Sequence, residues 1–90
     1  MMARIECADK YEAQKLAGLA GGRGPGISSI LDVIGEEVVV GLQDGSAHSI
    51  LMRGGVEAGE LADFFQSIFD GRHRLAGADA DGPHIVLSKG

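Results

Sequence analysis

The sequence lacks several features that would place a small protein in a specialised class. It has no tryptophan, two prolines and a single cysteine, Cys7, in 90 residues. One cysteine excludes an intramolecular disulfide and suits a reducing compartment. No stretch approaches the roughly 18 consecutive apolar residues of a membrane-spanning helix, and the N-terminus carries no hydrophobic signal region. These absences predict a cytoplasmic protein that does not bind membranes.

Basic patches are also missing. The net charge is −5, and residues 1–45 contain seven acidic and four basic residues, against six and four in residues 46–90. Because no basic patch is available to neutralise phosphates, nucleic-acid binding is not expected. The hydrophobic content of 44% and the charged content of 23% are those of an ordinary globular chain. The length predicts one domain, residues 1–90.

A strongly amphipathic segment, Leu61–Phe69, carries the largest hydrophobic side chains. It contains all three phenylalanines of the chain, Phe64, Phe65 and Phe69. With the leucine and the isoleucine of the segment they occupy positions i, i+3, i+4, i+7 and i+8, which form one face of a helix. We therefore expect a helix that covers the core and ends at Gly71.

Shorter patterns predict a strand and a second helix near the N-terminus. Ala3–Ala8 alternates apolar and polar residues, which indicates a half-buried strand that places Cys7 in the core. Asp9 is followed three residues later by Glu12, the reciprocal capping pattern of a helix start. The helix is expected to end near Gly21.

Three other segments complete the predicted order. Ile27–Ile34 fits a strand that turns at Gly35–Glu36, and it also fits a short helix; we favour the strand. Leu75–Gly82 consists of small and acidic residues and is predicted to be a loop. His84–Ser88 is predicted to be the final strand.

The clearest hairpin joins Glu37–Gln43 to Ser46–Arg53 through Asp44-Gly45, a typical two-residue type I′ turn. Such a turn pairs Gly41 with His48 and Val39 with Ile50. One face, beneath the helices, would then hold Val38, Val40, Leu42, Ala47, Ser49 and Leu51. The other, exposed face would hold Val39, Gly41, His48, Ile50 and Met52, which is apolar for a surface that meets water.

The predicted fold class is α+β, with two helices packed on one face of an antiparallel or mixed sheet of four to five strands. The element order is β-α-(β)-β-β-α-β, in which the bracketed strand is Ile27–Ile34. Without that strand the order is similar to the split βαβ arrangement of ferredoxin-like domains. This similarity concerns element order alone.

Motifs for catalysis or for metal binding are weak. His48 has no acidic residue placed by the sequence to orient its ring, so an enzyme using His48 is the least favoured function. The three histidines are far apart and have no cysteine partner, and no metal or other cofactor is expected. The GGRGPG connector, with Arg23 and Gly24, lacks the lysine and hydroxyl residues of a phosphate loop.

Two functions remain in contention. The first is a non-catalytic interaction module whose exposed face, Val39, Gly41, His48, Ile50 and Met52, binds a second copy or another protein. The alternative is a regulatory domain that binds a small anionic metabolite. The basic and flexible residues available to that anion are Arg23, Gly24, His48, Arg72 and Arg74.

Overall fold

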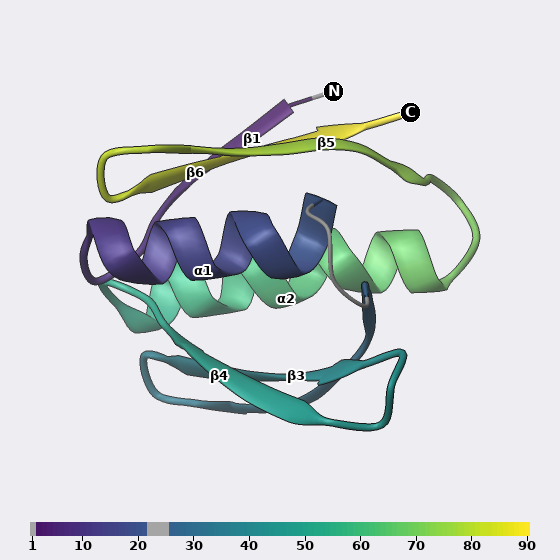
Figure 1. Ribbon diagram of the computed structural model, residues 1–90, viewed down its shortest axis with the longest axis horizontal. Helices are drawn as coiled ribbons and strands as arrows, with labels where there is room; N and C mark the ends of the chain where they lie inside the picture. The colour runs from purple at the N-terminus through teal and green to yellow at the C-terminus, as the bar shows by residue number, and fades with distance from the viewer. Residues whose placement is uncertain (1, 22–25) are drawn as a thin grey trace.

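Two α-helices lie between two three-stranded antiparallel sheets (Figure 1). This computed structural model describes residues 2–21 and 26–90. The first sheet has the strand order β1-β6-β5 and the second the order β2-β3-β4. The elements are β1 (Met2–Glu6), α1 (Lys10–Gly21), β2 (Ile27–Ile34), β3 (Glu37–Leu42), β4 (Ala47–Leu51), α2 (Gly55–Phe69), β5 (Leu75–Asp81) and β6 (His84–Lys89).

The two sheets meet at one corner. Cys7, just after β1, and Met52, just after β4, form an isolated antiparallel bridge. Beside it the Arg53 N–H donates to the Glu6 carbonyl at 3.2 Å, and the Ala8 N–H donates to the Leu51 carbonyl at 3.0 Å. From this corner the sheets diverge, which leaves room for the helices between them.

The α+β class and the two helices are confirmed, but the predicted arrangement is wrong in two respects. The described residues form six strands in two sheets rather than four to five in one, and the ferredoxin-like order is not found. The helices therefore have a sheet on each side. The additional strand is β5, in the segment predicted to be a loop.

Small residues explain why β5 was missed. Its sequence lacks the β-branched and aromatic residues that favour strands. It forms because β6 pairs along its length, from Leu75 opposite Lys89 to Asp81 opposite His84. The small side chains also let α1 approach closely, since a Cβ on Gly21 would lie 3.2 Å from that of Ala78.

The favoured strand at Ile27–Ile34 is confirmed, and two irregularities explain its ambiguity. The pairing of β2 with β3 shifts between Ile27 and Ser29 and again between Ile30 and Asp32. As a result Ile27, Ile30 and Val33 all lie opposite buried residues of β3. A strand with two bulges thus has a three-residue apolar period, which resembles that of a helix.

The register of the β3–β4 hairpin differs from the prediction by one residue. Val40 lies opposite His48, and Val38 lies opposite Ile50. The loop has three residues instead of two, because the Leu42 N–H donates to the Ser46 carbonyl at 2.9 Å. Gly45 ends this loop at φ 87°, the left-handed conformation that a three-residue hairpin loop requires.

The predicted cap at the start of α1 is present in part. Asp9 Oδ1 accepts hydrogen bonds from the N–H groups of Tyr11 and Glu12, both at 2.9 Å, and so caps α1. The carboxylate of Glu12 does not return to Asp9, as a reciprocal cap would; it accepts the N–H of Leu51 at 3.0 Å and ties α1 to β4.

The phenylalanine helix supplies the centre of the core. Phe65 is 2% exposed and packs edge-on against Phe64, with 5.6 Å between ring centroids. Its other neighbour is Phe69, whose ring stacks at 6.1 Å. The remaining buried apolar residues come from both sheets, from the bridge between them and from both helices: Ile5, Cys7, Ala13, Leu16, Val38, Val40, Leu42, Ile50, Met52, Ala58, Leu61, Ile85 and Leu87.

Candidate functional site

The second sheet has one face on the helices and one that no described element covers. Residues directly opposite each other in a sheet share a face, so the register assigns Ile34, Glu37 and Leu51 to one row of the uncovered face. We call this surface the outer face. Its residues are Ser29, Leu31, Asp32, Ile34, Glu37, Val39, Gly41, Ala47, Ser49 and Leu51.

Large apolar side chains are concentrated on this face. Ile34 is 60% exposed, Leu31 is 57% exposed and Leu51 is 43% exposed. Among the strands of the first sheet, the only exposed large apolar side chain is that of Met2 within the described residues. Several exposed apolar side chains on one uncovered sheet face are typical of an interaction surface.

The outer face is also acidic. No lysine or arginine occurs between Arg23 and Arg53, whereas four acidic residues do. Two of them, Asp32 and Glu37, lie on the outer face itself. The surface therefore combines apolar groups with negative charge, and it would complement a partner that is apolar and basic.

The predicted interface is wrong in its composition. Ile50 and Met52 have no exposed surface and belong to the core, because the one-residue change of register moves β4 side chains to the opposite face. Val39 does lie on the outer face and is half-buried. The signal that sequence reasoning missed is Leu31 and Ile34 on β2, the strand left ambiguous.

His48 and Gly41 are not paired as expected. His48 lies opposite Val40 and is exposed. The space above Gly41 is filled, since Ser29 Oγ lies 2.7 Å and Leu31 Cγ 3.4 Å from where a Cβ would stand. Gly41 therefore offers no space for a ligand; its missing side chain makes room for β2.

The residues predicted to bind an anion are described only in part. Arg23 and Gly24 lie outside the described residues, so a site around them stays a prediction. Arg72 is paired with Asp70, with 3.1 Å between guanidinium nitrogen and carboxylate oxygen. The side chain of Arg74 packs against Gly90 at the end of the first sheet.

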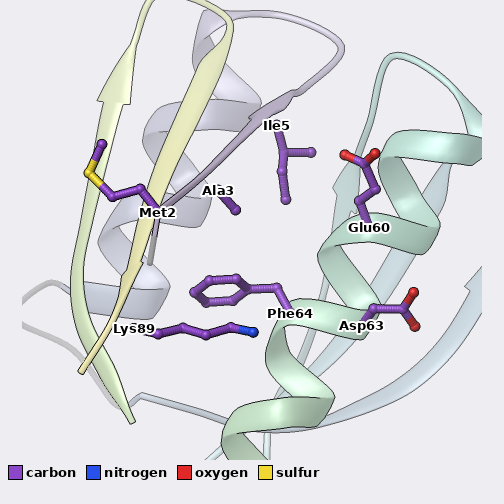
Figure 2. Close-up of a pocket in the computed structure, with 7 residues that line it drawn as sticks. All are labelled: Met2, Ala3, Ile5, Glu60, Asp63, Phe64 and Lys89. Atoms are coloured by element: carbon purple, nitrogen blue, oxygen red, sulfur yellow. The ribbon is translucent and has the colours of Figure 1, made fainter. Parts of the chain in front are cut away.

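A hollow that the sequence did not reveal lies between β1 and α2 (Figure 2). Its volume is about 270 Å³. The residues around it are Met2, Ala3, Ile5, Glu60, Asp63, Phe64 and Lys89. The only signal in the sequence was that Glu60 and Asp63 share the exposed side of the phenylalanine helix.

Clusters of metal-binding side chains are not found in the described part of the chain. No three His, Cys, Asp or Glu side chains of residues 2–21 and 26–90 are close enough to hold a metal ion. The hydroxyl of Ser46 and then its N–H donate hydrogen bonds to the Asp44 carboxylate, and these hold the pKa of Asp44 below its usual value. Neither described helix is long and apolar enough to cross a membrane.

Cys7 is buried, and its environment predicts a thiol that is unreactive in the folded protein. Burial, followed by the charges of Glu12 and Asp9, raises its pKa from 9.0 to about 11. The folded state thus binds the thiol proton more tightly than the unfolded state. Its contribution to stability is present below pH 9 and is lost as the pH rises through 11.

We expect the free energy of unfolding to fall by roughly 2–3 kcal/mol between pH 9 and 11 because of this thiol. Urea denaturation at each pH, compared with the Cys7→Ala variant, measures the effect. The variant lacks the thiol and should show a smaller fall. Parallel profiles for the two proteins would contradict the raised pKa.

The comparisons with known proteins give no family for this chain. No protein-family model, curated protein sequence or solved structure matches it.

Proposed function

We propose that the protein is a non-catalytic interaction module that binds a partner protein through the outer face. The observation that carries this proposal is the group of exposed apolar side chains, Leu31, Ile34 and Leu51, on a sheet face that the helices leave uncovered. Burial of apolar surface is the dominant favourable term in most protein association. Such a face is therefore the part of the described surface best suited to bind a partner.

Charge favours a different protein over a second copy as the partner. In a symmetric pair the acidic residues Asp32 and Glu37 would lie within one interface with those of the other copy, and like charges there oppose association. A partner that presents apolar side chains bordered by lysine or arginine would satisfy both components of the face. We therefore assign the face to a basic, apolar protein surface.

The size of the face favours a transient complex. Three strands spaced roughly 4.8 Å apart, with about six residues each rising roughly 3.4 Å, give a flat area of roughly 14 by 20 Å. This is well below the roughly 800 Å² per partner of a standard interface. Weak binding that declines with salt is the expected behaviour.

The test compares two variants of the full chain in capture experiments from a lysate of the source cells. Leu31→Ser with Ile34→Ser removes apolar groups from the outer face. Tyr11→Ser with Val56→Ser removes comparably exposed apolar groups elsewhere, away from both the outer face and the hollow beside β1. Since these side chains are exposed, both variants should keep the wild-type melting temperature within a few degrees.

We expect to capture a protein that binds to wild type and to the Tyr11/Val56 variant, that does not bind to the Leu31/Ile34 variant, and that elutes in high salt. If wild type and both variants capture the same proteins from the lysate, the proposal is wrong. Sedimentation equilibrium at micromolar concentration tests whether a second copy of the chain binds the outer face instead. A wild-type dimer that becomes a monomer only in the Leu31/Ile34 variant would assign the outer face to self-association.

A further inference from the structure

The hollow between β1 and α2 is an apolar groove with an acidic border, at a site distinct from the outer face (Figure 2). Ala3 and Ile5 line it from β1, and the ring of Phe64 lines it from α2. Asp63 precedes Phe64 by one residue and Glu60 precedes it by four, and both acidic side chains are exposed. The groove thus combines an apolar floor with two carboxylates.

The backbone of β1 is unpaired along this groove. In an antiparallel ladder, alternate residues direct both N–H and C=O toward the same neighbour. Cys7 donates its N–H to Pro83 on the side of β6, at 2.8 Å, whereas Glu6 accepts a hydrogen bond from Arg53 on the opposite side. Arg4 lies two residues before Glu6, so its N–H and C=O also point toward the side away from β6.

No described strand pairs with that side of β1 before the corner. The contact with the second sheet begins at Glu6, and the chain leaves it at Arg53 to enter α2. β1 is therefore an open edge over Met2–Ile5 within the described residues. An open edge next to an apolar groove is the arrangement in which an extended peptide adds to a sheet as one more strand.

Electrostatics determines which peptide would fit. Neither Glu60 nor Asp63 forms an ion pair with any residue in the described part of the chain. Lys89 does not neutralise them; its Nζ lies 5.0 Å from the centroid of the Phe64 ring and interacts with that ring. A cationic side chain on the peptide would give the two carboxylates the partner they lack.

We propose that this groove binds an extended peptide that pairs with the open edge of β1. The peptide places an apolar side chain against Phe64 and Ile5, and a lysine or arginine two residues away beside Glu60 and Asp63. Alternate residues of a strand share a face and are roughly 7 Å apart. This is close to the spacing between Glu60 and Phe64, because helix neighbours four residues apart have Cβ atoms roughly 5–6 Å apart.

The volume of the groove also favours a peptide over a free metabolite. At about 270 Å³ it is smaller than the roughly 300–1,000 Å³ of sites that enclose a drug-sized ligand. It accommodates one or two side chains. The remaining binding free energy would come from backbone hydrogen bonds to Arg4, which a small amine does not make.

The test uses a phage-displayed library of random heptapeptides selected against the full wild-type chain. We expect enriched sequences with an apolar residue two positions from lysine or arginine. Binding of the most enriched synthetic peptide is then measured by fluorescence anisotropy. On isotope-labelled protein the peptide should shift the amide resonances of residues 2–5 and 60–64.

Three variants separate the parts of the proposal. Arg4→Pro removes an N–H that β6 does not use, whereas Arg4→Ala removes the same side chain and keeps the N–H. We expect Arg4→Pro to weaken binding at least tenfold, and Arg4→Ala less than twofold. Glu60→Gln with Asp63→Asn, which keeps the shape of both side chains, should weaken binding roughly five- to tenfold.

Other outcomes overturn the proposal. No enrichment over a parallel selection against the Glu60/Asp63 variant would exclude a peptide site here. Equal affinity of Arg4→Pro and Arg4→Ala, together with n-hexylamine competing at low millimolar concentration, would show an amine site without strand addition. Resonance shifts confined to residues 27–51 would move the peptide to the outer face and leave this groove without a ligand.

Discussion

Replacing Ile50 by aspartate is expected to unfold the protein. Ile50 has no exposed surface and lies opposite Val38 in the core between the second sheet and the helices. The variant would bury a carboxylate without a partner and would also remove the packing of the isoleucine. Together these changes should lower the free energy of unfolding by more than about 4–5 kcal/mol. A chain of 90 residues has a total stability of only about 5–13 kcal/mol.

Far-UV circular dichroism, a thermal melt and an amide NMR spectrum measure the result. Ile50→Asp should show no cooperative transition and poorly dispersed amide resonances. The matched control is Leu51→Asp, one residue further along on the outer face, where the leucine is 43% exposed. We expect this variant to stay folded and to lose less than about 1 kcal/mol.

The pair of variants also tests the hairpin register directly. With a two-residue loop Ile50 would face water and Leu51 would face the core, so the outcomes would be reversed. A folded Ile50→Asp beside an unfolded Leu51→Asp would therefore contradict the structure. Ile50→Val, which removes one methyl group, should cost about 0.5–1.5 kcal/mol and confirm that the site is packed.

The sequence could not determine this register, for a physical reason. Residues 38–40 are all valine, and residues 50–52 are isoleucine, leucine and methionine. Both faces of the two strands are therefore apolar near the sheet centre, and the hydrophobic pattern fits either register. The Asp44-Gly45 pair does not decide it, since glycine also takes the left-handed position of a three-residue loop.

Features that depend on residues close together in the sequence were predicted correctly. The phenylalanine helix and the Asp9 cap follow from spacings of three and four residues, and both are present. The strand β5 and the second sheet depend on partners distant in the sequence. For β5 the decisive influence is β6, because its own residues have little preference for a strand.

The outer face and the groove also depend on residues that are distant in the sequence. The acidic pair Glu60 and Asp63 is visible in the sequence, but the groove also needs Ala3 and Ile5, which are more than fifty residues away. The outer face required the position of β2, whose two bulges hide its alternation. Both surfaces are created by tertiary packing.

Replacing Phe65 by alanine is expected to have the second largest effect, about 3–5 kcal/mol of destabilisation. The ring is 2% exposed and contacts Phe64 and Phe69 in the layer between the sheets. Because the sheets enclose α2 from both sides, we expect removal of this buried ring to leave a cavity. For a domain of this size the melting temperature should fall by roughly 15–30 °C.

Urea denaturation of three variants makes this prediction specific to the position of the ring. Phe69→Ala removes a half-buried ring at the end of α2 and should cost about half as much as Phe65→Ala, since less apolar surface is lost. Val56→Ala alters a residue of α2 that is 72% exposed and should change the stability by less than about 0.5 kcal/mol. The expected order is therefore Phe65, Phe69 and Val56. If Phe65→Ala cost no more than Phe69→Ala, the ring of Phe65 would not be at the centre of the core, and α2 would not be enclosed between two sheets.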